Sequence, residues 1–207
     1  TVETLTDEQL HIVFVVYTSA IAPLVLIPLL HIKRLIPSWV LGVYITSFVV
    51  CALGWELWFN YGLVQGDSVE IRRALGLNQR IPLHLNWILN SLADAGAICC
   101  GGLLLCWLSF GRHPQLFSRW RSSVFVFLLC FFIGQNILVE MFLYHDQLEV
   151  GKTLSWAPLS PLGSQWNPLL FEFQGRTINL QSQMPWLIMT PAFYYLLIRY
   201  LGREQGL

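Results

Sequence analysis

Long apolar runs separated by short polar segments extend along almost the whole chain. A bilayer core about 30 Å thick needs about 20 apolar residues for each helix that crosses it. Four runs meet this length, namely residues 10–32, 36–62, 85–110 and 122–145. A fifth and shorter run, 184–201, contains Pro185 and Pro191, which predicts a kinked or tilted span. We therefore predict an all-α fold, a polytopic integral membrane helical bundle of about five transmembrane helices in one membrane domain over residues 1–207.

The composition agrees with a membrane environment. Hydrophobic residues make up 55% of the chain and charged residues 12%, whereas about a quarter of the residues of soluble domains are charged. The 12 basic and 12 acidic residues balance, which argues against a nucleic-acid partner, because phosphate contacts need a basic surplus. The five cysteines all fall inside apolar runs, which indicates small buried side chains: Cys51, Cys99, Cys100, Cys106 and Cys130.

Local signals mark the ends of the predicted helices. Thr6 and Gln9 have the spacing of a capping box, which predicts that the first helix starts just before His11. Pro82 precedes the third apolar run and Gly111 follows it. These signals agree with the boundaries taken from hydropathy.

The distribution of basic residues predicts the orientation, since Lys and Arg near span ends favour the cytoplasmic side. One side of the predicted bundle carries seven of them: Lys33, Arg34, Arg112, Arg119, Arg121, Arg199 and Arg203. The other side carries five: Arg72, Arg73, Arg80, Lys152 and Arg176. We therefore expect the N-terminus outside and the C-terminus in the cytoplasm.

The two outer connections, about 63–84 and 146–183, are long enough to hold structure of their own. The second contains a segment rich in aromatic residues and proline, Trp156 to Phe173. This composition favours a structured outer loop that lies as a cap on the membrane interface. Such a cap could also dock a membrane-protein partner.

Three carboxylates fall inside the apolar runs, where each ionisable group requires a partner or a function. They are Glu56, Asp94 and Glu140, and the predicted orientation puts all three in the outer leaflet. Each has an amide four residues away on the same helix face, namely Asn60, Asn90 and Asn136. Turning these faces together makes a polar pocket in which one acid stays protonated beside an ionised base, as general acid–base catalysis requires. The alternative is a hydrogen-bonded polar core that only holds the helices together.

Aromatic and histidine side chains surround the same layer. Trp55, Trp58 and Trp87 fit an interfacial aromatic belt, or line the pocket as substrate-binding residues that stabilise a cation through their ring faces. His11, His84 and His145 fit interfacial residues at outer helix ends, and a less favoured interpretation joins them into a metal site. No cofactor is otherwise expected.

A resemblance adds to these observations. The segment Gly54-Trp55-Glu56-Leu57-Trp58, together with Trp87 through Asp94, resembles the small polytopic membrane terpene cyclases of fungal and bacterial meroterpenoid pathways. Those proteins carry a Trp-Glu pair in an early helix, use membrane-embedded acids to protonate an isoprenoid, and typically have seven spans. In layout the chain is also similar to the five-helix sterol isomerases, although Ala52 stands where their histidine precedes the acid.

Two hypotheses follow. The first is an integral membrane enzyme, a cyclase or isomerase, that takes a lipid or isoprenoid substrate from the outer leaflet. Glu56 or Asp94 would donate the proton, and Glu140 would act as base or charge stabiliser. The second is a non-catalytic subunit of a larger membrane complex that docks a partner and holds lipid, quinone, pigment or metal.

Overall fold

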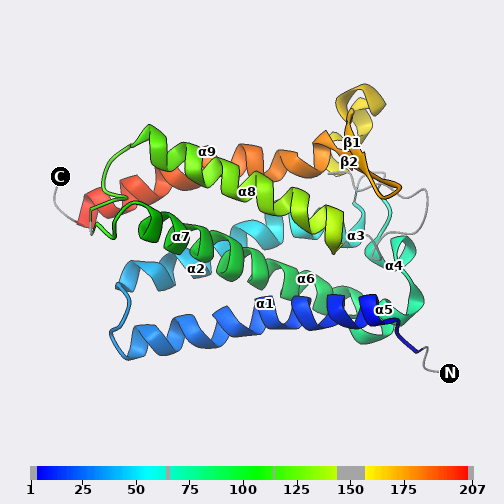
Figure 1. Ribbon diagram of the computed structural model, residues 1–207, viewed down its shortest axis with the longest axis horizontal. Coiled ribbons are helices and arrows are strands. Elements are labelled where there is room, and N and C mark those ends of the chain that lie inside the picture. The colour runs from blue at the N-terminus through cyan, green and yellow to red at the C-terminus, as the bar shows by residue number, and fades with distance from the viewer. Residues whose placement is uncertain (1–3, 64–65, 114, 144–156, 205–207) are drawn as a thin grey trace.

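The computed structural model describes residues 4–63, 66–113, 115–143 and 157–204. Five long helical segments lie side by side along the longest axis of the molecule (Figure 1). They are α1 (Asp7–Ile32); α2 (Ser38–Cys51) with η1 (Ala52–Glu56) and α3 (Leu57–Tyr61); α6 (Leu83–Ala93) with η2 (Asp94–Cys100) and α7 (Gly101–Ser109); α8 (Ser122–Phe142); and α9 (Leu180–Glu204).

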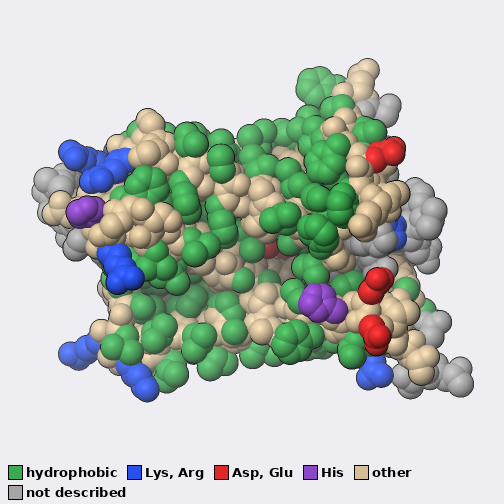
Figure 2. All heavy atoms as spheres, viewed as in Figure 1, with side chains coloured by type: hydrophobic (Ala, Val, Ile, Leu, Met, Phe, Trp, Pro, Cys, Tyr) green, Lys and Arg blue, Asp and Glu red, His purple; other side chains and the backbone are tan. Residues whose placement is uncertain are grey.

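Four of these segments are long and apolar enough to cross a membrane: Asp7–Ile32, Ser38–Tyr61, Leu83–Ser109 and Ser122–Phe142. They coincide with the four predicted full-length runs. Large apolar side chains such as Phe14 and Leu104 remain exposed on their flanks, and hydrophobic atoms cover much of the face seen in Figure 2. This surface suits contact with lipid better than contact with water.

The fifth predicted span lies within α9, a single helix of 25 residues with Pro185 and Pro191 inside it. This helix is long enough to cross a bilayer. Among the described residues it is not one of the four that are also apolar enough. Besides Gln181, Ser182 and Gln183 in its first turn, it carries Pro185, Pro191 and Arg199 further along. Full membrane crossing by α9 therefore stays a prediction.

The capping box at the start of α1 is confirmed. The backbone N–H of Gln9 donates to the Thr6 hydroxyl at 3.2 Å, and the backbone N–H of Thr6 donates to the Gln9 side chain at 3.2 Å. The helix begins at Asp7 with Thr6 as its N-cap, as this spacing predicted, and the acidic first turn suits the helix dipole.

The described residues are mostly helical, as predicted, and a small two-stranded sheet lies in the predicted outer loop. After the short helices η3 (Ala157–Leu162) and η4 (Ser164–Trp166), strands β1 (Leu169–Phe173) and β2 (Arg176–Asn179) form an antiparallel hairpin. Its two-residue turn has positive φ at Gln174 (48°) and Gly175 (77°), the conformation that matches the twist of paired strands. Part of the predicted outer cap, residues 144–156, lies outside the described residues.

Among the described residues, three clusters of buried apolar side chains hold the bundle. Helices α8 and α9 join through aromatic rings, where Phe132 lies 5.2 Å from Trp186 and 5.8 Å from Phe193 between ring centroids. Helix α1 lies against α6 and η2, and Gly96 permits this close approach, since a Cβ there would come within 2.2 Å of Pro23. The short helices α4 (Val69–Arg72) and α5 (Leu75–Arg80) complete the end at which α1 begins.

Candidate functional site

Two of the long segments contain π-helical turns, and both turns carry a carboxylate. Glu56 is the last residue of η1 and Asp94 is the first residue of η2. The indole N–H of Trp55 donates to Asp94 Oδ2 at 2.7 Å and so joins the two turns. A π-helical turn inserts a residue into the α-helical repeat and is frequent at functional sites.

A cavity of about 180 Å³ lies beside this hydrogen bond. All five long segments contribute to its wall, and the polar lining residues are Ser19, Glu56, Asn90, Asp94, Gln135, Asn136 and Ser182. Glu56 is buried, whereas Asp94 is half-buried and thus more accessible from the cavity. Among the described residues that line the cavity, none carries a positive charge.

The cavity lies between α1 and α8, which both contribute to its lining. Figure 2 shows an acidic side chain at the base of a hollow between these two helices, on the apolar flank of the molecule. A lipid chain in the bilayer could therefore reach the carboxylates from the side.

Glu56 has amide partners on two helices. Asn60 donates to Glu56 Oε2 at 2.7 Å, as the sequence spacing predicted, and Asn90 also hydrogen-bonds to this carboxylate. Asn90 was expected to pair with Asp94, four residues away on the same helix. Trp55 is instead the hydrogen-bond partner described for Asp94.

A buried chain of hydrogen bonds continues outward from Asn60. Asn86 donates to Asn60 Oδ1 at 2.5 Å, and Arg73 Nη1 donates to Asn86 Oδ1 at 2.9 Å. The same guanidinium donates through Nε to Asn78 at 2.7 Å and through Nη2 to the Ile81 carbonyl. A cation at the end of the bundle where α1 begins is thus connected to a carboxylate inside the bundle.

Glu140 lies behind the cavity rather than in its described lining. Its Oε1 accepts from Asn136 at 3.0 Å and from Gln183 at 2.9 Å. Asn136 also donates to the Ser182 carbonyl at 3.1 Å. Glu140 therefore links α8 to α9 and contacts the cavity through Asn136.

The predicted aromatic residues divide into two groups. Trp55 lines the cavity together with Phe59 and Trp186, and the Trp55 and Trp186 ring centroids lie 5.0 Å apart. Trp87 donates instead to the Ala52 carbonyl at 2.9 Å, and Trp58 is not among the described lining residues.

Sequence reasoning missed several residues of the site. Asn86 precedes Asn90 and Asp94 at four-residue spacing, so extending that face by one turn could have found it. Arg73, Gln183 and Trp186 come from a connection and from another helix, and no local spacing links them to Glu56 or Asp94.

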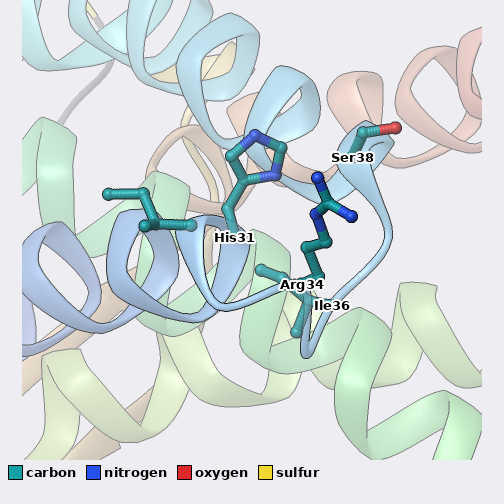
Figure 3. A pocket seen from close by; sticks show the side chains of 5 residues that line it. His31, Arg34, Ile36 and Ser38 are labelled. Carbon is teal, nitrogen blue, oxygen red and sulfur yellow. The ribbon is translucent and has the colours of Figure 1, made fainter.

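The less favoured metal site is not assembled by the described residues, in which no group of three metal-ligating side chains occurs. His84 Nδ1 and the Tyr61 hydroxyl are hydrogen-bonded at 2.6 Å, and His145 lies outside the described residues. A second pocket of about 500 Å³ lies where α1 meets α2 and is lined by His31, Ile32, Arg34, Ile36 and Ser38 (Figure 3). These lining residues include no carboxylate, so this pocket lacks an acid–base pair.

The resemblance to terpene cyclases and the similarity to sterol isomerases stay predictions, and the site has to be interpreted from its own chemistry. That chemistry is two carboxylates, several amides and three aromatic rings around one cavity. No protein-family model, no curated protein and no solved structure matches the chain.

Proposed function

We propose that the chain is an integral membrane enzyme that rearranges a hydrophobic lipid or isoprenoid substrate by acid–base catalysis between Asp94 and Glu56. The observation that carries this proposal is a cavity within an apolar bundle that is lined by two carboxylates and, among its described residues, by no cation. Two like charges in such a cavity repel each other, so one acid retains its proton while the other is ionised. This is the state that general acid–base catalysis uses.

The reaction class is one that needs no co-reactant. The Asp94 carboxyl transfers its proton to an alkene carbon or an epoxide oxygen, and a carbocation forms on the substrate. The cation rearranges or closes a ring, and the Glu56 carboxylate removes a proton to form a new double bond. The product is an isomer of the substrate, and proton exchange between the acids restores the starting state.

The aromatic side chains of the cavity fit this chemistry. Trp55, Phe59 and Trp186 line the same space as the two acids. The face of an aromatic ring attracts a cation within about 6 Å and does not act as a nucleophile or base. These rings can therefore stabilise the intermediate without capturing it.

The size of the cavity limits what it holds. A volume of about 180 Å³ slightly exceeds that of an apolar cavity of about 150 Å³ that binds benzene. The cavity thus accepts one end of a lipid, and the rest of the substrate extends through the hollow between α1 and α8 into the bilayer. With the predicted orientation, this entry is from the outer leaflet.

Glu140 has a supporting role in this proposal. Its hydrogen bonds to Asn136 and Gln183 fix two polar side chains where α8 meets α9. It would act on the substrate only through Asn136, in contrast to the catalytic role predicted from its sequence position.

The proposal is tested by lipid analysis of cells that produce the full chain or its variants. Glu56→Gln and Asp94→Asn should each lower formation of the product isomer by about 100-fold or more, the usual contribution of a positioned acid or base. Glu70→Gln is the matched control, because Glu70 is exposed and lies outside the cavity. Full product formation by both cavity variants would refute the proposal.

The alternative, a non-catalytic subunit, is favoured by the hairpin. Leu169, Leu170 and Phe171 are 51%, 45% and 38% exposed on β1, and Trp166 before it is 58% exposed. An apolar surface at a polar end of the bundle is suited to a membrane partner. Purification from native membranes with the same partners each time would support the subunit, whereas an active lone chain would exclude it.

A further inference from the structure

We infer that Arg73 is a positioning residue that acts through Asn86 and Asn60 to keep Glu56 ionised, which leaves Asp94 as the acid that carries the proton. The ionised state of Glu56 is inferred from the orientation of the hydrogen-bond chain that ends on it. Only the catalytic meaning of that state rests on the proposed function.

The direction of the chain is fixed at its Arg73 end. A guanidinium has N–H donors and no acceptor, so Asn86 must turn its oxygen toward Arg73 and its amide nitrogen toward Asn60. Asn60 then accepts from Asn86 and has only its nitrogen left for Glu56, to which it donates at 2.7 Å. Glu56 therefore always receives an N–H, and this arrangement favours a carboxylate over a carboxylic acid.

The whole hydrogen-bond chain is buried. Arg73 and Asn86 are each 2% exposed, Asn60 is 1% exposed and Glu56 is 5% exposed. Hydrogen bonds in such a setting polarise one another, and a charge at each end of the chain increases the effect. A buried guanidinium and a buried carboxylate thus stabilise each other through two amides.

Arg73 stays charged at neutral pH. Burial, followed by the charge of neighbouring Arg72, lowers the pKa of Arg73 to about 10, which is still well above neutrality, while Glu70 opposes the shift. The described hydrogen-bond acceptors of Arg73 are the side-chain oxygens of Asn78 and Asn86 and the Ile81 carbonyl, none of which is charged.

The other groups near Glu56 act in both directions: the charge of Asp94 opposes ionisation of Glu56, whereas Asn90 and Arg72 favour it. Asp94 approaches it from η2, Asn90 from α6 and Arg72 from α4. Asn90 donates a further hydrogen bond, and Arg72 adds positive charge on the outer side. Asp94 has one described donor, Trp55, and no amide chain behind it. Of the two cavity acids, Asp94 is therefore the one that holds a proton.

Infrared spectroscopy of the full chain in lipid nanodiscs tests this inference without a substrate, because protonated and ionised carboxyl groups absorb at different frequencies. The wild type should show a protonated-carboxyl band, which Asp94→Asn should remove and Glu56→Gln should leave in place. Arg73→Gln should add one protonated-carboxyl band, and this new band should vanish when Glu56→Gln is combined with it.

Asn86→Asp interrupts the chain with little change of shape. The new carboxylate still accepts from Arg73 but cannot donate to Asn60, so an extra band should appear here too, and it should vanish when Glu56→Gln is combined with it. Arg80→Gln is the control, since Arg80 is an exposed cation of the same connection whose side chain is no member of this hydrogen-bond chain, and it should add no band.

Two results would overturn the inference: a wild-type band that disappears with Glu56→Gln instead of Asp94→Asn, or folded Arg73→Gln and Asn86→Asp variants without a new band. Either result leaves the proposed catalysis to its own test, in which product formation is measured. Conversely, bands that appear as expected in a protein that forms no product would refute the catalysis and support the role of Arg73.

Discussion

The indole N–H of Trp55 lies 2.7 Å from Asp94 Oδ2 and connects two π-helical turns on different membrane-spanning segments. The same indole packs against Trp186 of α9. Trp55 thereby orients the proposed proton donor and forms part of the cavity wall, and these two roles can be separated by substitution.

Trp55→Phe should lower product formation while the fold is retained. The phenyl ring keeps most of the contact with Trp186 but has no N–H for Asp94, so the carboxyl loses its fixed orientation. We expect a loss of about 5-fold, smaller than for Asp94→Asn, since one hydrogen bond contributes about 1 kcal/mol. Product formation equal to wild type would show that this hydrogen bond does not orient a catalytic group.

Glu140→Ala should destabilise the contact between α8 and α9. The substitution removes the acceptor of the Asn136 and Gln183 amides at a buried position, and leaving buried donors unsatisfied costs about 1–3 kcal/mol. Thermal unfolding in detergent measures the effect. The control is Leu138→Ala on the same helix, because Leu138 is 54% exposed and its truncation should lower the unfolding temperature less.

The sequence predicted the two acid–amide pairs that lie within one helix. Asn60 bonds to Glu56 and Asn136 bonds to Glu140 at the predicted four-residue spacing. The partner of Asp94 could not be predicted in this way, because η1 and η2 depart from the α-helical repeat and bring Trp55 to it from another segment. Local spacing describes one helix and carries no information on which faces of two helices meet.

Arg73 illustrates the same limit more strongly. From the sequence it is one of five basic residues on the predicted outer side, where a solvated surface position is the usual expectation. Its burial depends on how α4 and α5 fold against the ends of α3 and α6, which hydropathy does not describe. The span boundaries, in contrast, depend only on local apolar length, and four of them were predicted to within a few residues.

Gly96→Ala should weaken the packing of α1 against η2 and lower the stability of the bundle. A Cβ at this position would lie 2.2 Å from Pro23 Cβ and 3.1 Å from the Tyr44 ring, and relieving such overpacking costs about 1–3 kcal/mol. The variant should unfold at lower temperature than Gly134→Ala, since nothing lies within 4 Å of a Cβ at Gly134. Equal unfolding temperatures would contradict the packing of α1 against η2.

The predicted orientation is tested with cysteines placed in two connections and a maleimide that cannot cross membranes. Glu70→Cys should react in intact cells, and Gln115→Cys should react only after permeabilisation, because both positions are exposed and at opposite ends of the bundle. The native cysteines lie within helices and give the background. The reverse labelling pattern would invert the topology and move the cavity entry to the inner leaflet.

The most direct test of the proposed function is an experimental density map of the full chain in native lipids with Asp94→Asn, which should retain substrate. We predict an elongated density that enters between α1 and α8 and ends between Glu56 and residue 94. A metal ion or a planar pigment in the cavity would contradict the proposed lipid chemistry. So would a cavity closed off from the bilayer by contact between α1 and α8.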